Sequence, residues 1–593
     1  METYMLAILS LLPIISVGIL LVALRWPASR AMPICYLVAA GLATFVWRVS
    51  SWQIAAATVR GLIVAVELLY IVFGAVLLLN TLEQSGGLDK IRQTFRNVTA
   101  DRRIQVIIVA WLFGSFVEGS AGFGTPAAVA GPLLVGLGFP AMAAAMAGMI
   151  IQSTPVSFGA VGTPILVGVS GGLSSDPAVL EFSRAAGYAD WPAFLATIGW
   201  RVALLHAVAG TLIPLFLVSF MTRFFGTNRS FAEGLAVWRF ALFAALAMTI
   251  PYLLVAYCLG PEFPSLLGGL IGLALVVPAA KRGFLMPRSE DAWEFEQREL
   301  WPAEWIGTLD VEQPPAAAAP MSLLTAWAPY MLVAILLVAS RLKPLGLAGY
   351  LTACAIPIQD IFGTGIGHSV KPLYLPGTIL ILVSLMTCPL HRMNWRSYRR
   401  AWAHSTKTLL KASIALMFTV PMVQVFINSG DGAAGYHEMP VALAVGVEQL
   451  TGEFWPLFSP AIGGIGAAVA GSNTISNMMF SLFQFQVGER IGVDPIWIVA
   501  LQAVGGAAGN TICVHNVVAA LAVVGLVGRE GAILRKTLIV FAYYAALSGA
   551  LGYAVVWNST KGLLNIGTIV VLGIVCLAIV MIATRKPPLN PEP

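Results

Sequence analysis

The stretch Phe113-Gly-Ser-Phe-Val-Glu-Gly-Ser-Ala-Gly-Phe-Gly-Thr-Pro126 decides how this chain folds. It begins as apolar sequence and then places one carboxylate, Glu118, beside Gly119, Gly122 and Gly124. A lone acid next to a glycine-rich break makes a poor membrane-spanning helix, because charge and bare backbone are costly in lipid. The stretch therefore predicts a turn of backbone held inside protein at membrane depth.

The composition identifies the class of protein around this turn. The chain has 593 residues, of which 58% are hydrophobic and only 10% are charged, whereas about a quarter of the residues of a soluble domain are charged. We therefore expect an all-α polytopic membrane protein. The net charge of +6 resides in short loops, where it sets topology, and does not indicate a nucleic-acid partner.

Thirteen apolar runs are candidates to cross a bilayer, which takes roughly 17–25 residues. They lie near 5–24, 31–48, 61–80, 141–170, 196–222, 237–258, 262–280, 322–341, 373–388, 412–428, 496–527, 537–556 and 563–583. The first run has no positively charged segment before it, so we interpret it as a retained span and not as a cleaved signal peptide.

Two further apolar regions, 104–138 and 454–488, are interrupted at their centres. The arm 104–117 would be about 21 Å long as a helix, against a hydrocarbon core of about 30 Å. We therefore predict that both regions are re-entrant hairpins, with tips at 118–126 and 471–477.

The basic residues support this threading. They concentrate in segments 89–103, 389–411 and 528–536 and in the tail at Arg585 and Lys586. If thirteen spans cross and both hairpins return to their own side, all these segments are cytoplasmic, as basic loops should be. The N-terminus is then periplasmic and the C-terminus cytoplasmic, and the hairpins enter from opposite sides.

The chain divides into two membrane halves, 1–280 and 321–593. Between them, 281–320 is hydrophilic and ends in a proline- and alanine-rich run, which we interpret as a solvated cytoplasmic linker. Each half contains its hairpin and then a span broken by glycine, proline or polar residues, 141–170 in the first half and 496–527 in the second.

The halves also resemble each other in sequence. Val117-Glu-Gly-Ser120 can be placed over Val469-Ala-Gly-Ser472, and Gln152 to Gly159 has the spacing of Gln502 to Gly509. Inverted repeats with broken helices form the midplane sites of many secondary transporters. We therefore expect an elevator-like transporter whose hairpins and broken spans meet at a central site.

Two titratable residues are candidates for proton coupling. Glu118 is a lone carboxylate at membrane depth, where it is expensive when ionised; the alternative is that it pins the hairpin. His515 lies beyond the second break and could belong to a proton relay, or could be a packing histidine. His206, on another span, is interpreted as structural.

Neutral polar residues are the candidates for substrate binding, because hydroxyls, amides and helix ends can hold a carboxylate without a buried cation. At the second tip the alternative role is helix capping. The predicted contacts are Gly119, Ser120, Gly122, Gly124 and Thr125 at the first tip, Gln152, Ser153 and Thr154 in the first broken span, Ser472, Asn473, Thr474, Ser476 and Asn477 at the second tip, and Gln502 and Asn510 in the second broken span.

Nothing in the sequence indicates an enzyme. The six cysteines are scattered without CxxC spacing, so we expect no metal site or disulfide framework. The glycine clusters do not follow strand patterns, which excludes a phosphate-binding loop. We expect no cofactor.

Several segments resemble the L-lactate permease family. They are Phe113–Gly138, Thr154-Pro-Val-Ser-Phe-Gly-Ala-Val-Gly-Thr-Pro164, Gly471–Phe480 and Ala500–Asn516. The resemblance covers most of the chain and implies a bacterial inner-membrane symporter. Such a protein takes up a 2-hydroxymonocarboxylate (L-lactate, often also D-lactate and glycolate) together with a proton.

The tip Ser472-Asn473-Thr474 is also similar to tips of sodium-coupled dicarboxylate carriers, which show it in both halves. Here the first tip instead has Gly119-Ser-Ala-Gly122 and adds Glu118, which favours a proton over sodium. The alternatives are a sodium-coupled carrier of a dicarboxylate or sulfonate, an anion channel, or a membrane enzyme. The expected partners are the small acid and the lipid bilayer, and a homodimer is left open.

Overall fold

The computed structural model describes residues 2–20, 24, 26–96, 98–122, 124–288, 291–307, 321–341, 345–526 and 529–585. In this part of the chain nearly all regular structure is helical. The two strands, β1 (Ile356–Ile358) and β2 (His368–Val370), pair antiparallel with Ile356 opposite Val370. The prediction of an all-α polytopic membrane protein is confirmed.

In the described part of the chain, twenty helical segments precede the linker. They are α1 (Glu2–Gly18), α2 (Ala28–Phe45), α3 (Ser51–Gln84), α4 (Gly87–Arg96), α5 (Arg102–Val106), the π-helix η2 (Ile107–Phe113), α6 (Gly114–Ala121), α7 (Thr125–Gly136), α8 (Ala141–Ile150), η3 (Ile151–Ser153), η4 (Pro155–Phe158), α9 (Gly159–Thr163), η5 (Pro164–Val169), α10 (Ser170–Leu173), α11 (Pro177–Ala185), α12 (Trp191–Gly210), α13 (Ile213–Phe225), α14 (Phe231–Leu235), α15 (Trp238–Leu259) and α16 (Pro264–Lys281).

The remaining helices lie in the described part of the linker and in the chain after it. They are η7 (Arg298–Leu300), η8 (Ala303–Trp305), α17 (Leu323–Arg341), α18 (Leu347–Ala353), η10 (Ile361–Gly363), α19 (Pro376–Leu390), α20 (Trp395–Ile427), α21 (Met439–Thr451), η11 (Gly452–Phe454), α22 (Trp455–Ala470), α23 (Asn473–Arg490), α24 (Pro495–Gly509), η12 (Asn510–Ile512), α25 (Val514–Ala522), α26 (Glu530–Val556), α27 (Asn558–Lys561) and α28 (Ile566–Ala583).

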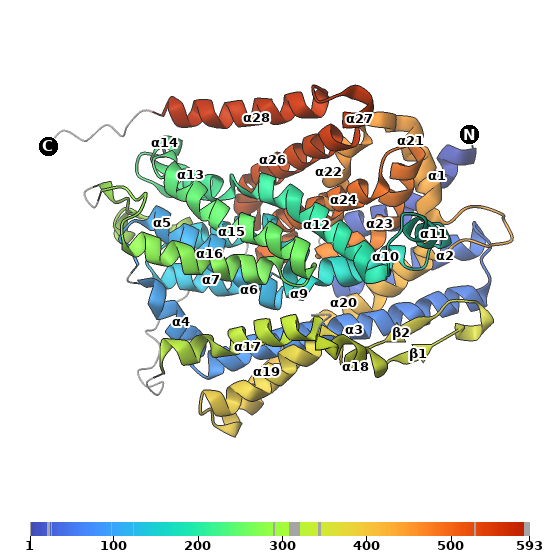
Figure 1. Cartoon of the computed structure of the whole chain (residues 1–593), viewed down its shortest axis with the longest axis horizontal. Helices are drawn as coiled ribbons and strands as arrows, with labels where there is room; N and C mark the ends of the chain where they lie inside the picture. The colour runs from blue at the N-terminus through green and yellow to red at the C-terminus, as the bar shows by residue number, and fades with distance from the viewer. Residues whose placement is uncertain are drawn as a thin grey trace.

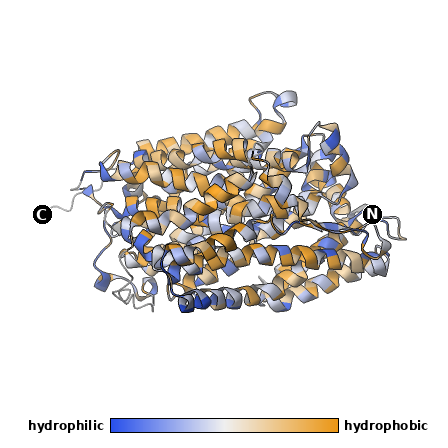
Figure 2. Cartoon of the chain, turned by 60° about the horizontal axis from the view of Figure 1, so that its bottom comes forward, coloured by the Kyte–Doolittle hydropathy of each residue, from blue (hydrophilic) through white to orange (hydrophobic). Residues whose placement is uncertain are grey.

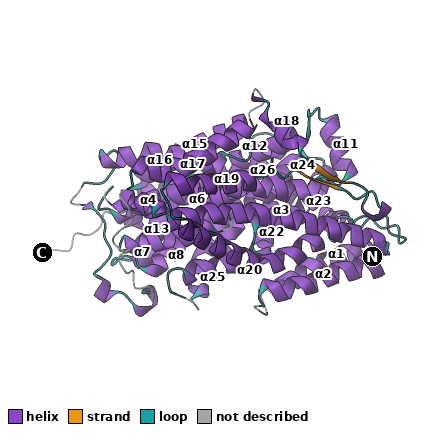
Figure 3. Cartoon of the chain, turned by 90° about the horizontal axis from the view of Figure 1, so that it is seen from below, coloured by secondary structure: helices purple, strands orange, loops and turns teal. Residues whose placement is uncertain are grey.

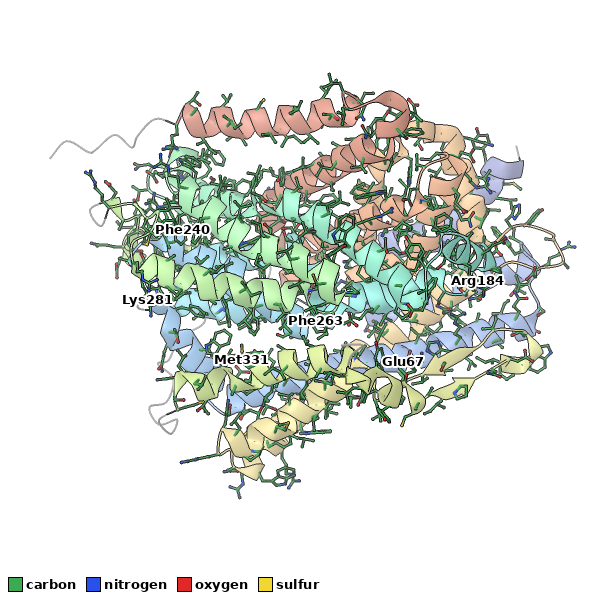
Figure 4. All side chains as sticks on the ribbon, viewed as in Figure 1. Glu67, Arg184, Phe240, Phe263, Lys281 and Met331 are labelled. Carbon is green, nitrogen blue, oxygen red and sulfur yellow. The ribbon has the colours of Figure 1, made fainter. Side chains whose placement is uncertain are left out.

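The long helices run roughly parallel to the long axis of the molecule, and the two termini lie at opposite ends of the bundle (Figure 1). Apolar residues fill the middle, and polar residues gather at the two ends (Figure 2). Lys281 and Arg184 mark these ends, with Phe263 between them (Figure 4). The strands lie at one end only, so the body is helical throughout (Figure 3).

The described residues contain ten helices long and apolar enough to cross a membrane, or up to twelve if each of two bent pairs is one span. The sequence predicts about thirteen. The predicted runs at 5–24 and 373–388 are missing from this count because α1 and α19 have only 17 and 15 residues. The helical stretch Arg102–Ala121, which the sequence predicts as a hairpin arm, is included in it.

The region 104–138 forms a helical hairpin, but its first arm is longer than expected. Arg102–Ala121 is an apolar helical stretch of 20 residues, which is about 30 Å long. The prediction that this arm is too short to cross the hydrocarbon core is therefore wrong. Glu118 and the small residues around it remain helical, and Gly122, with φ of +65°, ends the helix. The chain then returns through α7, and the Arg102 side chain donates to the carbonyl of Leu137, which joins the two open ends of the hairpin.

The region 454–488 forms a second helical hairpin from α22 and α23. Its turn is Gly471, with φ of +79°, followed by Ser472. The Trp455 indole nitrogen donates to Gln484 Oε1 at 2.8 Å, which ties the two arms together near their open ends. The turn is shorter than the predicted 471–477, because Asn473 already begins α23.

Both predicted broken spans are interrupted. In the first, Ala160, Val161 and Gly162 have φ of 42°, 56° and 75°, so the helix stops completely before it resumes at Pro164. In the second, α24 and α25 meet at a 42° bend. Left-handed conformations at residues other than glycine are strained and concentrate at functional sites.

The described part of the linker is mostly exposed, but it is anchored to the first hairpin through Phe295 and its neighbours. The proline- and alanine-rich run lies outside the described residues. Phe295 is 6% exposed and packs against Phe139, with ring centroids 5.1 Å apart. The backbone N–H of Arg102 donates to the carbonyl of Trp293 at 3.0 Å, and the Arg102 guanidinium pairs with Glu294 at 2.7 Å. The aromatic residues of this polar segment therefore hold it across the open end of the first hairpin.

Candidate functional site

A cavity of about 90 Å³ lies where the two hairpin turns and the two broken spans converge. This exceeds the ~10–15 Å³ needed for one water. Its lining residues are Glu118 and Gly122 from the first hairpin, Val156, Gly159, Ala160, Thr163 and Pro164 from the first broken span, Gly471, Ser472, Asn473 and Thr474 from the second hairpin, and Asn510 and Asn516 from the second broken span. Residues more than 350 positions apart thus form one polar chamber.

Glu118 is the only charged residue among the described residues that line this cavity. Its side chain comes from the last turns of α6, is 1% exposed, and leaves Oε2 without a hydrogen-bond partner in the described part of the chain. Gly159 lies directly against Oε1, where a Cβ would overlap the carboxyl group. A buried carboxylate without a cation is costly when ionised, so this environment suits a group that exchanges a proton.

The second hairpin contributes neutral groups to the same cavity. Asn473 is 1% exposed, and neither its side-chain oxygen nor its nitrogen has a partner among the described residues. Asn510, 5% exposed, likewise has an unpartnered Oδ1. Buried polar atoms are almost always hydrogen-bonded, so this concentration of unpartnered amides indicates a place for a polar ligand.

The N-terminus of α23 faces this chamber. Its N-cap residue, Ser472, is extended and makes no side-chain capping bond. The first N–H groups of an 18-residue helix are then free to bind an anion, and the helix dipole favours negative charge there. The α6 end at Ala121 has the opposite polarity, because carbonyl groups point out of a helix C-terminus.

Several predicted contacts lie outside the lining. One of them is Gln152, whose amide bonds to Gly148, Met149 and Asn516. Gly119 is inside α6, where a Cβ would overlap the backbone of Leu266 on α16, so its role is close packing. Other residues outside the lining make hydrogen bonds within the protein. The side chains of Ser120, Ser153, Ser476 and Asn477 donate to the backbone carbonyls of Val117, Ile150, Gly463 and Pro164, respectively. The Thr154 hydroxyl bonds to the Tyr544 hydroxyl, and Gln502 Nε2 donates to Ser476 Oγ. Gly124 and Thr125 begin α7 beside the cavity without lining it.

His515 is not brought to Glu118. Its side chain is exposed and does not line the cavity. It lies beside the turn of the second hairpin, where a Cβ on Gly471 would be 3.3 Å from its Nδ1. Of the two candidates for proton coupling, Glu118 therefore lines the cavity and His515 does not.

Asn516 is one of the polar side chains in the lining that the sequence does not single out. It is in the first turn of α25, just beyond the second break, and its Nδ2 donates to Gln152 Oε1 at 3.1 Å. A polar residue that starts a helix after a mid-span break was the available signal. Gly159, Ala160 and Thr163 line the cavity because of the backbone conformation of their segment, which cannot be predicted from any one residue type.

His206 belongs to a separate buried chain of hydrogen bonds. Its Nδ1 lies 2.6 Å from the Tyr544 hydroxyl and its Nε2 lies 2.8 Å from Ser157 Oγ, which in turn donates to the carbonyl of Ala503. These contacts fit the structural interpretation. Among the described residues, no group of three or more His, Cys, Asp or Glu side chains could hold a metal ion.

Comparison with known proteins identifies the family. A family model described as L-lactate permease matches residues 6–557. The chain belongs to the L-lactate permease family. A Haemophilus influenzae protein that carries a provisional L-lactate permease name is 30% identical over 92% of this chain and 97% of its own length.

Other members of the L-lactate permease family have names that differ in substrate. The L-lactate permease of Bacillus subtilis is 26% identical over 79% of this chain and 81% of its own length. The glycolate permease GlcA of Escherichia coli is 26% identical over 92% of this chain and 94% of its own length. No solved structure matches the chain.

Proposed function

We propose that this protein is a secondary active transporter, not an enzyme, that imports L-lactate, D-lactate and glycolate across the bacterial inner membrane by proton symport. Relatives named for L-lactate and for glycolate support this substrate class. The observation that carries the proposal is the single cavity in which Glu118 meets the unpartnered amides of Asn473 and Asn510. In such a cavity the amides can bind the carboxylate of a small hydroxy acid, and Glu118 can bind the proton.

The substrate carboxylate binds at the second hairpin. The free N–H groups at the start of α23 and the Nδ2 of Asn473 donate to it, as expected for an anion held without a buried cation. The cavity lining contains no lysine or arginine among the described residues. Binding a single negative charge in this setting is therefore favoured when a proton is bound nearby.

Glu118 takes that proton, and His515, which is exposed beside Gly471, is not required for the step. One lactate anion and one proton together carry no net charge. Uptake therefore draws on the pH difference and not on the ~2.3 kcal/mol that each charge gains per 100 mV.

The moving unit in this proposal consists of the two hairpins with the two broken spans, in inverted repeats, travelling as in an elevator against the remaining helices. Its support is that each hairpin contacts the broken span of the other half. Asn477 in α23 donates to the carbonyl of Pro164 at 3.1 Å, and a Cβ on Gly124 would be 3.1 Å from Asn516 Oδ1. We place the N-terminus in the periplasm and the C-terminus in the cytoplasm.

The test is uptake of labelled L-lactate into proteoliposomes with an imposed inward proton gradient, with and without sodium. We expect concentrative uptake that collapses with a protonophore and is unchanged by sodium. Uptake that needs sodium and ignores pH would support the second candidate, a sodium-coupled carrier of a dicarboxylate or sulfonate, which the Ser472-Asn473-Thr474 turn favours. Uptake that never exceeds equilibrium would indicate a channel.

A further inference from the structure

The Gln152 side chain fixes the orientation of the Asn516 amide, which lines the cavity. Gln152 is fully buried, and its Nε2 lies 3.3 Å from the carbonyl oxygen of Gly148 and 3.4 Å from Met149 Sδ. A carbonyl oxygen only accepts hydrogen bonds, so the amide nitrogen of Gln152 must face it. Its Oε1 is thereby fixed toward the second broken span.

Asn516 is oriented in turn by that oxygen. Its Nδ2 donates to Gln152 Oε1 at 3.1 Å, and its Oδ1 faces Gly124, where an added Cβ would lie 3.1 Å from this oxygen. Gly124 has φ of +74° and no side chain that could cover this oxygen. Because Asn516 lines the cavity, the pair presents a hydrogen-bond acceptor there.

An acceptor is the wrong partner for a carboxylate, whose oxygens also accept. The unpartnered Nδ2 of Asn473 and the free N–H groups of α23 are the donors that a carboxylate needs, and they come from the second hairpin. On a 2-hydroxymonocarboxylate, the group that donates is the 2-hydroxyl. The chamber thus offers complementary groups to both functional groups of such an acid.

We infer that Asn516 Oδ1 accepts the hydrogen bond of the substrate's 2-hydroxyl group, and that Gln152 is the positioning residue that fixes this acceptor. The inference rests on the proposed function, which supplies the substrate class. It adds a specificity-determining residue that separates hydroxy acids from acids of the same size that lack the hydroxyl.

The inference predicts which analogues are rejected. Propionate has no hydroxyl and would leave Oδ1 of Asn516 unpaired. Asn516 is half-buried, and a bound acid without a hydroxyl would cover its Oδ1 without pairing it. A polar group that is buried without a partner costs about 1–3 kcal/mol, so the wild type should prefer L-lactate to propionate by about tenfold. Pyruvate places a carbonyl oxygen against the same acceptor and should also be rejected.

The experiment compares the KM of L-lactate with that of propionate in proteoliposomes of full-length protein. Asn516→Leu removes the acceptor, and we expect the preference for L-lactate to fall about tenfold. Gln152→Met keeps the volume of the glutamine but frees the Asn516 amide to rotate, and we expect a partial fall of about threefold. Gln484→Met is the matched control, because Gln484 is a buried glutamine that is hydrogen-bonded through both its Oε1 and its Nε2 and does not line the cavity.

The readouts separate the possible failures. A ratio that stays at the wild-type value in both Asn516→Leu and Gln152→Met overturns the inference, while wild-type lactate uptake still supports the proposed function. Absence of lactate uptake by the wild type overturns the proposed function itself. If Asn516→Leu does not fold, Gln152→Met decides by the same ratio. An equal fall in Gln484→Met would show a general packing effect and overturn the assignment.

Discussion

The two hairpin turns end their first helix with the same backbone hydrogen bond, but they differ in the side chains that they bring to the cavity. In the first, the N–H of Gly122 bonds to the carbonyl of Glu118 at 2.8 Å; in the second, the N–H of Gly471 bonds to the carbonyl of Ala467 at 2.9 Å. Both glycines have positive φ. The position that carries a carboxylate in one turn thus carries a methyl group in the other, and only the first turn brings a titratable group.

This comparison also revises the pairing of the two halves. The sequences place Gly119 over Gly471, whereas the helix-ending glycines place Gly122 over Gly471, three residues further on. The first turn ends a helix with a carboxylate one turn behind it, and the second starts α23 with Asn473. We interpret the first as the proton side of the cavity and the second as the anion side.

The largest expected effect is on the first turn. Gly159→Ala places a methyl group on Oε1 of Glu118, although the backbone there, with φ of −66°, suits any residue. We expect proton-driven lactate uptake to be lost. Gly573→Ala, where a Cβ meets nothing within 4 Å, is the control, and normal uptake by Gly159→Ala would show that Glu118 need not hold this position.

The next effect is on the second turn. Asn473→Leu removes the amide that donates to the carboxylate in our proposal, so the KM of lactate should rise about tenfold, the factor that 1.4 kcal/mol gives. The dependence of uptake on the pH gradient should remain. If the pH dependence is lost as well, the two turns do not divide the chemistry as proposed.

A smaller effect concerns the stability of the turn. Gly471→Ala forces a side chain into a left-handed conformation, which costs about 1–2 kcal/mol, and thermal unfolding in detergent should shift to lower temperature. The control is Gly136→Ala, where a Cβ meets nothing within 4 Å. An unchanged melting temperature for Gly471→Ala would contradict the left-handed conformation of residue 471 in this turn.

The smallest effect is at the segment across the first hairpin. Glu294, 53% exposed, pairs with Arg102, and exposed ion pairs contribute about 0–1 kcal/mol. We expect Glu294→Gln to lower stability slightly at low salt and not at high salt. A loss that persists at high salt would indicate that the pair acts through packing.

The sequence predicts the class of fold, both hairpins and both breaks, because lone charges, glycines and apolar run lengths are local signals. It misplaces the end of the first hairpin arm, since an acid and small residues continue a helix that is buried in protein. The sequence does not identify the cavity role of Asn516 or the anchoring of the segment around Phe295. Each depends on a contact with a distant residue, Gln152 in one case and Phe139 in the other.

The central claim is that the carboxylate of the first turn couples the proton to transport. Its most direct test is Glu118→Gln, which keeps the shape of the side chain and removes its ionisation. Labelled lactate is measured in two modes, accumulation driven by a pH gradient and exchange against internal lactate at equal pH. The account predicts that accumulation is abolished and exchange is retained; accumulation at the wild-type level would contradict it.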